Sequence, residues 1–424
     1  MLNKKIVVLC HSSSIGGAEL ALASLMQSTN ESCDWSMVLP VGGNIDDRLT
    51  VNAHKVHRLD LPWWCHEAHD SPRKINAKRL FSELRKLEKI ASDADILLTN
   101  TITMPWLSFV ATKLKIPHIW HIHEFGDLDH NLQFVIGYKR SLEIISLNSS
   151  RVLTISNAVN KHLSQVIPTE NIDIIHQSID FSNIAFSPTN ISDPDKQLRL
   201  VVLGAIKPSK GQDIAIKAVQ LVNSSQPNRI KLDIIGPNAN QKYCQKLIKE
   251  TTKDDNISVE PGSFTPDVEL ELHDIVVMAS NNEALGRVTL EGLAAGKIVI
   301  GFACTATQEL LSDNRGILYS PNKPEILAKT LTDLQSKMNS INPEYNRKYV
   351  SDTYSQTVQA TDFIASIGKA KKAPPNPNNT QNEYIATLIA KNLLYGRVAH
   401  LKSQLRKFLI TRTPKQIKKF IRKS

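Results

Sequence analysis

Residues 274–297 read DIVVMASNNEALGRVTLEGLAAGK, and this stretch decides the fold of the second half of the chain. DIVVMAS is a short β-branched run, typical of a buried parallel strand. The run that begins after Gly286 has helical spacing and ends at Gly296, a residue type that favours helix C-termini. A strand, a loop and a helix in this order form the repeating unit of a doubly wound sheet, which binds its ligands at the carboxyl ends of the strands.

The loop and the first turns of the predicted helix carry two glutamates, Glu283 and Glu291. Because the first amides of a helix have no intrahelical partner, those of Arg287 and Val288 after Gly286 predict an anion site that fits a diphosphate. The two carboxylates would then accept hydrogen bonds from hydroxyls on either side of the diphosphate, and sugars supply such hydroxyls. Taken alone, an ordinary loop acid and a solvated helix glutamate explain the pattern better.

Two further loops combine glycine with the start of a helix. Residues 204–219 read GAIKPSKGQDIAIKAV, in which Gly204 follows a strand and Lys210 precedes a helix, so the lysine is predicted to reach a phosphate. An exposed lysine in a plain loop explains this pattern equally well. Gly16 and Gly17 open the first helix and would let the backbone approach a ligand. Tight turns use the same dipeptide, and the dinucleotide fingerprint of three spaced glycines is absent.

Short apolar runs alternate with longer amphipathic stretches along the chain, the pattern of an α/β protein with parallel sheets. The segment SPTNISDPDKQ has the composition of a linker, and the alternation restarts after it. Two similar doubly wound domains facing a cleft are therefore predicted. The predicted strands are residues 5–10, 35–40, 95–100, 117–123 and 151–156, then 198–204, 231–236, 274–280, 297–302 and 316–320.

This organisation gives four predicted segments. Residues 1–186 form the first domain and residues 197–350 the second. A closing helix covers 351–371, and 372–424 form a linker and a basic amphipathic helical tail.

Composition agrees with two globular domains, since 424 residues exceed what one core usually spans. No apolar run is long enough to cross a bilayer, and MLNKKIVVLC is predicted to be a first strand rather than a signal peptide. The 5 cysteines lack paired spacing, which favours reduced thiols. A cytoplasmic protein is therefore expected.

The net charge of +10 is concentrated at the C-terminus. From Arg397 onward there are 10 basic residues and no acid, so the remaining 41 basic residues balance all 41 acids. Nucleic-acid binding by the whole surface is therefore not expected. Apolar residues recur at helical intervals in the tail, which favours an anionic membrane surface as its partner over a solvated tail or a helix docked on another protein.

Several of these motifs, in this order, resemble the retaining glycosyltransferases of family 4, also called group 1, which have the GT-B fold of two Rossmann-like domains. The resemblance covers about residues 1–350. It rests on EALGRVTLEGLAAGK with its paired glutamates, GAIKPSKGQ with its lysine, HDIVVMAS, and TATQELLSDNRGILYSP. In the first half, IGGAE is similar to the family's glycine loop and HIHEF to its histidine segment.

The resemblance implies a nucleotide-sugar donor, a glycan or lipid-linked glycan acceptor, and no metal or other cofactor. It implies that Lys210 neutralises the leaving diphosphate and that Glu283 holds donor-sugar hydroxyls. It also implies that Glu291 binds the ribose and that His123 contacts the donor sugar. The remaining implied donor-binding residues are Gly16, Gly17, Gly204, Gly286, Arg287 and Val288.

The sequence departs from the family pattern at three loops. Gln177 and Ser178 stand where Asn-Gly is usual. Ala205 stands where many members have arginine, so either Lys207 compensates or the site carries less positive charge. Thr305 and Ala306 stand where glycines are usual, which puts backbone contacts to the donor sugar in doubt. We expect Glu309 to be no more than a helper.

Three other motifs have simpler explanations. His121 and His123 are expected to point to opposite faces of a strand, with His121 packed or hydrogen-bonded in the core. WWCHEAH, which contains Cys65, lacks the partner cluster that a zinc site needs and is predicted to be a loop. DLDH, which contains Asp127, is predicted to be a solvated turn.

We therefore expect a retaining hexosyltransferase-type enzyme acting on a lipid-linked or growing surface polysaccharide, peripheral at the inner face of the membrane. The alternatives are an epimerase or phosphorylase of the same fold, and a non-catalytic donor-binding scaffold in a polysaccharide assembly complex. Turnover without an acceptor product would favour the first alternative.

The basic tail generates a prediction of its own. Removal of residues 374–424 should abolish cosedimentation with anionic vesicles, because each basic residue near an anionic leaflet contributes about 1 kcal/mol. Neutral vesicles are the control. Unchanged sedimentation of the truncated protein would contradict membrane contact by the tail.

Overall fold

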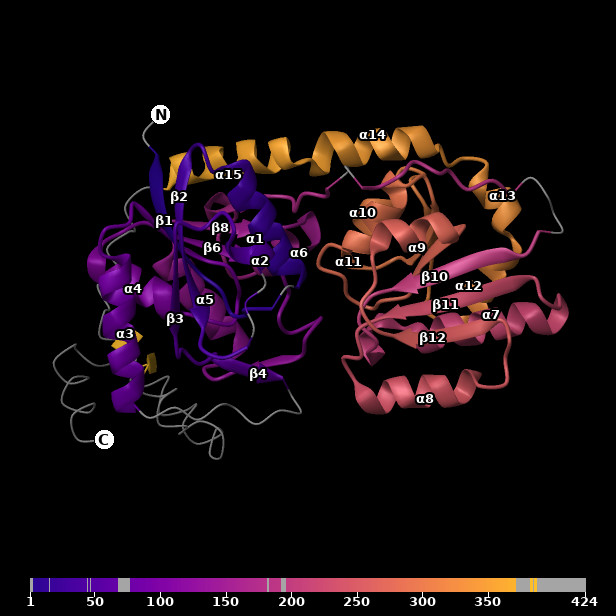
Figure 1. Ribbon diagram of the computed structural model, residues 1–424, viewed down its shortest axis with the longest axis horizontal. Coiled ribbons are helices and arrows are strands. Elements are labelled where there is room, and N and C mark those ends of the chain that lie inside the picture. Colours follow the sequence, from indigo (N-terminus) through magenta and orange to yellow (C-terminus); the bar gives the residue numbers. More distant parts are fainter. Residues whose placement is uncertain are drawn as a thin grey trace. The chain divides into compact units, whose positions relative to one another are not determined.

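The computed structural model describes residues 3–370 except 15, 44, 46, 68–76, 181–182 and 192–195, together with 382, 383, 385 and 386. The described residues form two compact units (Figure 1). The first unit comprises residues 1–155, 159–176 and 359–424, and the second comprises residues 156–158 and 177–358. Apart from four residues, the predicted linker and basic tail lie outside the described part of the chain.

The first unit is built on a seven-stranded parallel sheet in the order β3-β2-β1-β5-β6-β8-β9. Apolar side chains of its central strands are buried on both faces, as a doubly wound sheet requires. Its strands are β1 (Lys4–Leu9), β2 (Cys33–Pro40), β3 (Lys55–Leu59), β5 (Ile96–Thr99), β6 (His118–Ile122), β8 (Arg151–Thr154) and β9 (Ile172–Ile174). An antiparallel pair is formed by β4 (Cys65–Glu67) and β7 (Leu132–Phe134).

The helices of this half of the chain follow the strands. They are α1 (Gly17–Ser28), α2 (Asp47–Thr50), α3 (Ala77–Ala91), α4 (Trp106–Leu114), α5 (Tyr138–Asn148), α6 (Asn157–Leu163) and the 3₁₀ turn η1 (Thr169–Asn171). The much later helix α15 (Gln356–Lys369) completes the unit.

The second unit contains a six-stranded parallel sheet in the order β12-β11-β10-β13-β14-β15. Its strands are β10 (Leu198–Leu203), β11 (Ile230–Gly236), β12 (Ile257–Pro261), β13 (Ile275–Met278), β14 (Ile298–Phe302) and β15 (Ile317–Tyr319). Its helices are η2 (Pro208–Lys210), α7 (Gln212–Ser225), α8 (Gln241–Thr251), α9 (Pro266–Leu272), α10 (Arg287–Ala294), α11 (Thr305–Leu311), α12 (Pro324–Thr332), α13 (Leu334–Met338) and α14 (Pro343–Tyr354).

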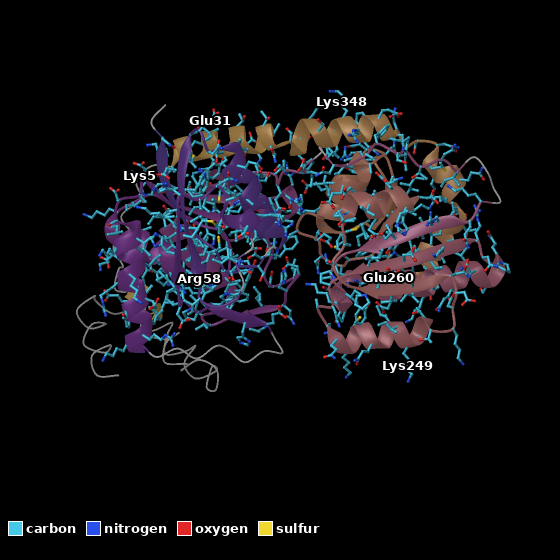
Figure 2. The ribbon with its side chains drawn as sticks, viewed as in Figure 1. Lys5, Glu31, Arg58, Lys249, Glu260 and Lys348 are labelled. Atoms are coloured by element: carbon cyan, nitrogen blue, oxygen red, sulfur yellow. The ribbon has the colours of Figure 1, made fainter. Side chains whose placement is uncertain are left out.

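In each sheet the strand order reverses beside the first strand, β1 in one unit and β10 in the other. The loops at such a switch point diverge and leave room for a ligand at the carboxyl ends of the strands. Apolar side chains fill the space between sheet and helices, whereas Lys249 and Lys348 project outward (Figure 2). The two-domain α/β prediction is confirmed, and all ten predicted strands are found.

The predicted closing helix over 351–371 is in fact two helices, and its start is wrong. Asn342 caps α14 by accepting from the Tyr345 amide at 2.8 Å, so that helix begins before residue 351. An extended Ser355 then separates α14 from α15. The boundary predicted at 350 therefore falls inside α14.

Helix α15 packs into the core of the first unit, although it lies about 180 residues after β9 in the sequence. Phe363 is fully buried and stacks on Trp35 of β2, with ring centroids 5.7 Å apart. Asp173 at β9 accepts from the Ser366 hydroxyl at 2.7 Å and pairs with Lys369 at 3.2 Å. These contacts attach α15 to the first sheet.

Tryptophan fluorescence tests this attachment, because all 5 tryptophans lie in the first unit. Phe363→Ala should lower the free energy of unfolding of the first unit by about 3–5 kcal/mol, since it leaves a cavity against Trp35. Urea titration monitored by that fluorescence measures the loss. Leu221→Ala on α7, an exposed position of the second unit, is the control and should leave the transition in place. An unchanged transition in the Phe363 variant would show that α15 folds independently of this core.

Candidate functional site

The lysine loop of the second unit is fixed against the neighbouring strand by a glycine. Gly204, with a φ of +131°, ends β10, and the turn η2 then carries Lys210. Gly211 follows at a φ of +66°, where a β-carbon would lie 2.3 Å from the carbonyl oxygen of Ala279. Only glycine fits this close approach to the end of β13, so the Lys-Gly pair brings the lysine to the loop that carries the glutamates.

Lys210 and Glu283 meet there directly. The Lys210 Nζ atom lies 2.5 Å from Glu283 Oε1, and the carboxylate is buried. Burial favours a higher pKa for Glu283, but Lys210, Ser280 and Lys207 outweigh it and lower the pKa of this carboxyl. Glu283 is therefore ionised at neutral pH, and the two predicted residues form one charged pair.

The backbone of Glu283 is held as firmly as its side chain. Its amide donates to the Thr305 hydroxyl at 3.0 Å, and its carbonyl accepts from the Ala306 amide at 3.2 Å. Thr305 adopts a φ of +47°, a conformation that a β-branched residue rarely occupies. The departure from glycine thus brings in a hydroxyl that orients Glu283.

Helix α10 begins directly after this loop. Its N-cap, Gly286, has a φ of +82°, and the amides of Arg287 and Val288 occupy the first two helical positions. Helix geometry leaves such amides without intrahelical acceptors, and the helix dipole adds partial positive charge. This end of α10 can therefore hold an anion beside Lys210.

Glu291 lies one turn further along α10 and is largely buried. Burial raises its pKa despite Arg287, whose guanidinium lies 3.9 Å away. The same guanidinium donates to the Ser178 carbonyl at 3.1 Å. The Arg287 side chain therefore has a structural partner, and its predicted contribution to the site is that of its amide.

The small residues that follow Glu291 allow α10 to lie close to the sheet. A β-carbon on Gly292 would lie 3.1 Å from methyl groups of both Val276 and Val299, on β13 and β14. Close packing here fixes the height of the helix end above the strands. The run EGLAAG thus has a packing role that supports the anion site.

Glu309, for which at most an auxiliary role was predicted, accepts three hydrogen bonds within the protein. Its carboxylate accepts from the amide and the side chain of Asn157 and from the amide of Ala158, at 2.7–3.2 Å. These bonds satisfy it without a ligand.

The first unit presents its own polar cluster at the carboxyl ends of β1, β5 and β6. Gly16 is the N-cap of α1, and its amide donates to Glu19 Oε2 at 3.2 Å. A β-carbon on Gly16 would lie 2.9 Å from that oxygen, whereas Gly17 is the first residue of the helix. Burial raises the pKa of Glu19 to about 7, and its other oxygen lies 3.5 Å from His11 Nδ1.

His123 follows β6 in the same cluster. Its Nε2 lies 2.8 Å from Asn100 Oδ1, which makes this nitrogen the donor. Burial, followed by the neighbouring His121 and His11, lowers the pKa of His123 well below its usual value. His123 is therefore a neutral imidazole near neutral pH.

The prediction that His121 and His123 point to opposite faces is wrong. Their ring centroids are 4.0 Å apart, because residues two apart along an extended chain share a face. His121 is packed in the core, and neither ring nitrogen has a hydrogen-bond partner among the described residues. Within those same residues no group of three or more His, Cys, Asp or Glu could hold a metal ion.

The other two motifs are structural. The prediction that WWCHEAH is a loop is wrong at Cys65–Glu67, which form strand β4 with Cys65 buried, and His69 lies outside the described residues. Asp129 accepts from the amides of Phe125 and Gly126, and Asp127 lies 2.9 Å from His162 Nε2. The prediction of a solvated turn is therefore wrong, because both aspartates of this loop have partners within the protein.

Sequence reasoning assigned no role to Ser280, Glu19 and Asn100, and it treated Thr305 only as a departure from glycine. Glu19 had a sequence signal, since a glutamate three residues after an N-cap forms a capping box. Thr305 and Asn100 had none, because their roles depend on strands that are adjacent only in the folded sheets.

Two family models together match most of the chain. Residues 15–183 match the model described as Glycosyltransferase Family 4, and residues 185–353 match Glycosyl transferases group 1. The chain belongs to this family of glycosyltransferases. The two sheets are accordingly the Rossmann-like domains of the GT-B fold.

Solved structures of this glycosyltransferase fold are similar over most of the chain. The Anabaena protein Alr3699/HepE in complex with UDP and glucose superposes with a TM-score of 0.70 at 19% identity, covering 86% of this chain and 100% of that one. Sucrose-phosphate synthase from Thermosynechococcus elongatus gives a TM-score of 0.65 at 16% identity, covering 87% and 100%. At sequence identities of 19% and 16%, these structural similarities establish the fold alone.

Relatives identified by sequence similarity are also glycosyltransferases. An uncharacterized glycosyltransferase of Haemophilus influenzae is 22% identical over 69% of this chain and 79% of its own length. A D-inositol 3-phosphate glycosyltransferase of an Arthrobacter species is 25% identical, and the match spans 49% of each chain. None of the helices described for this glycosyltransferase is long and apolar enough to span a membrane.

The Lys210–Glu283 pair generates a prediction about stability and pH. Lys210→Met removes the main partner that offsets the burial of Glu283, so the folded-state pKa should rise above the unfolded value of about 4.3. A carboxyl with a raised folded-state pKa destabilises the fold once the pH exceeds its unfolded value. The variant should therefore lose about 2 kcal/mol relative to the native chain at pH 8 and much less at pH 4.

Calorimetric unfolding at both pH values measures this difference. Lys210→Met combined with Glu283→Gln is the control and should recover most of the loss at pH 8, because no buried charge remains. A deficit of equal size at pH 4 and pH 8 would show that the carboxylate is not the cause.

Proposed function

We propose that this glycosyltransferase transfers a hexose, with retention of configuration, from a nucleotide-sugar donor to a lipid-linked or growing surface polysaccharide at the cytoplasmic face of the membrane. The observation that carries the donor half is the meeting of Lys210, Glu283 and the start of α10 at one edge of the second sheet. A cation and helix amides suit a diphosphate, and a buried, ionised carboxylate beside them suits a sugar hydroxyl.

The chemistry that this arrangement favours is departure of a nucleoside diphosphate. As the glycosidic bond breaks, negative charge grows on the leaving oxygen, and Lys210 with the amides of Arg287 and Val288 would stabilise it more than the ground state. Glu291 would accept hydrogen bonds from the ribose hydroxyls. HepE has been solved in complex with UDP and glucose and in complex with UDP-glucose, which supports a nucleotide-sugar donor of this kind.

Glu283 and His123 would act on the sugar itself. An ionised carboxylate only accepts hydrogen bonds, so Glu283 would hold donor-sugar hydroxyls and fix the ring. A neutral His123 would contact the sugar without opposing the positive charge that develops on it. For retention, the departing phosphate would accept the proton of the attacking hydroxyl on the same face. In this proposal, departure of the diphosphate and attack by the acceptor hydroxyl proceed without a metal ion.

The donor is tested first by a thermal-shift panel of nucleoside diphosphates and their sugars. A ligand present at 100 times its Kd should stabilise the protein by about 2.7 kcal/mol. UDP-, GDP-, ADP- and CDP-sugars are compared, and each base is also tested as the free diphosphate. No stabilisation by any of them would contradict the donor assignment.

Glu283→Gln then separates an enzyme from a scaffold. It should lower transfer by about 100- to 1,000-fold, because it removes a charged acceptor aimed at the sugar, and it should change diphosphate affinity only a few-fold. Glu250→Gln on α8, an exposed glutamate, is the matched control. A scaffold would support polysaccharide assembly in cells equally well with either variant. NMR of the product's anomeric proton reports whether configuration is retained.

A further inference from the structure

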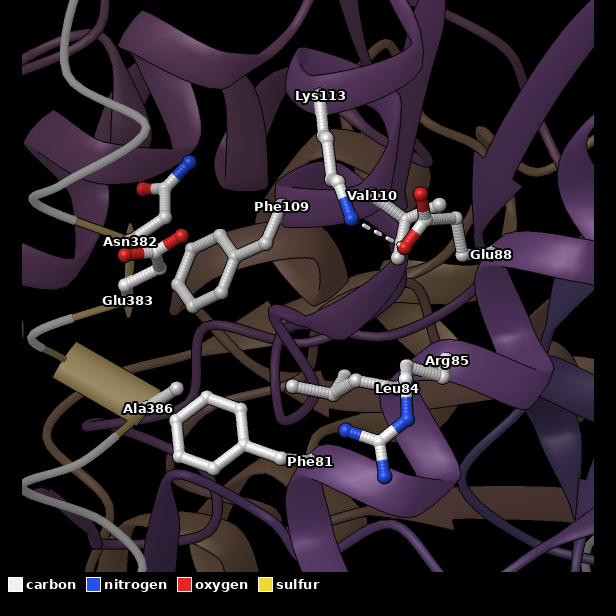
Figure 3. Close-up of a pocket in the computed structure, with 10 residues that line it drawn as sticks. All are labelled: Phe81, Leu84, Arg85, Glu88, Phe109, Val110, Lys113, Asn382, Glu383 and Ala386. Carbon is white, nitrogen blue, oxygen red and sulfur yellow. Dashed lines mark hydrogen bonds and ion pairs between the residues drawn. The ribbon is translucent and has the colours of Figure 1, made fainter.

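An apolar groove runs along the outer side of the first unit between α3 and α4 (Figure 3). Its apolar lining comes from Phe81 and Leu84 of α3 and from Phe109 and Val110 of α4, and it encloses about 270 Å³. An apolar cavity of about 150 Å³ is enough to hold a benzene ring, so this one has room for more than one aliphatic side chain. None of its lining residues takes part in the proposed reaction.

The rim of the groove carries an ion pair. Lys113 of α4 forms an ion pair with Glu88 of α3 at 2.5 Å, which ties the two helices together across one side (Figure 3). Arg85 is also on the rim. Because Phe81, Leu84, Phe109 and Val110 make up much of its lining, the groove offers an occupant apolar contact.

A piece of the C-terminal chain already sits in this groove. Asn382 and Ile385 are 2% exposed and Ala386 is 1% exposed, values typical of core residues. Asn382 Oδ1 accepts from the Asn148 side chain at the end of α5, at 3.2 Å. Asn382, Glu383 and Ala386 line the cavity with the helices.

The distance along the chain from α15 to Asn382 is short enough for both to belong to the first unit. Its preceding anchor is α15, held by Phe363 and by Asp173, and only residues 371–381 separate the described parts. A stretch of this length spans up to about 40 Å when extended, which is comparable to the width of a small domain.

The sequence that follows Ala386 contains aliphatic residues of the kind that could fill the cavity. The backbone is helical at the four described positions between 382 and 386. Positions three and four residues after Ile385 share its face in a helix, and they are Leu388 and Ile389. Both are aliphatic, so this sequence can continue the buried contact of Ile385 into the cavity.

We propose that the α3–α4 groove is the docking site for this chain's own segment 387–394, with Leu388 and Ile389 filling the cavity beside Ala386. The docked segment anchors the root of the basic tail, which begins at Arg397, to the first unit. Any membrane contact made by the tail then acts through this unit. The proposal does not depend on the proposed function.

Disulfide trapping tests the contact in the full-length chain. Val110→Cys combined with Leu388→Cys, in a Cys304→Ser background that removes the most accessible described thiol, should cross-link within one molecule under mild oxidation. Val110→Cys with Phe420→Cys is the matched control and should cross-link at least tenfold less. Equal yields for the two pairs would overturn the proposal, and so would a product of twice the monomer mass, because it would identify a second copy as the occupant.

Limited trypsin digestion gives an independent readout. Docking should protect the bond after Lys391, and Phe81→Asp should speed its cleavage at least tenfold by placing a charge in the groove. Leu221→Asp, on the exposed side of α7, is the control and should cleave at the native rate. Cleavage after Lys391 at one rate in all three proteins would show that the segment does not occupy the groove.

Discussion

The ion pair between Lys210 and Glu283 is the interaction on which the second domain's site depends. Two opposite charges 2.5 Å apart at a buried position are stable only if the loops that carry them cannot separate. Gly211 provides one constraint by letting the lysine loop lie against Ala279, and Thr305 provides the other through its hydroxyl. The pair is therefore a product of three strand ends rather than of either loop alone.

Charge is distributed differently in the two units. The second unit combines lysine with helix amides at its strand ends, which suits a ligand that carries negative charge. In the first unit, burial keeps His11, His121 and His123 neutral, lowering the pKa of the first to about 4 and of the second to about 3. A neutral imidazole such as that of His123 can form a hydrogen bond with a hydroxyl without adding charge. Charged groups thus mark the strand ends of the second sheet, and neutral imidazoles mark those of the first.

Local sequence patterns predicted the apolar strands but not the charged or very short ones. KVHRL of β3 and IDI of β9 are the two edge strands of the first sheet, where pairing with a neighbouring strand determines the conformation. Local patterns also misplaced the start of α14. Its cap at Asn342 precedes the apolar pattern from which a later helix was predicted. Side-chain partners were the least predictable feature. Asp127 meets His162 only because a loop folds back on α6.

The sequence by itself determined the two parallel sheets, the glycines that open their first helices, and the lysine and glutamates that carry the family resemblance. These features depend on residue type and short-range spacing, which local chemistry dictates. The tertiary structure decided that Lys210 pairs with Glu283, that Asn100 fixes the donor nitrogen of His123, and that α15 completes the first core. Those contacts join residues 23 to about 330 positions apart, and only the packing of whole sheets and helices brings such residues together.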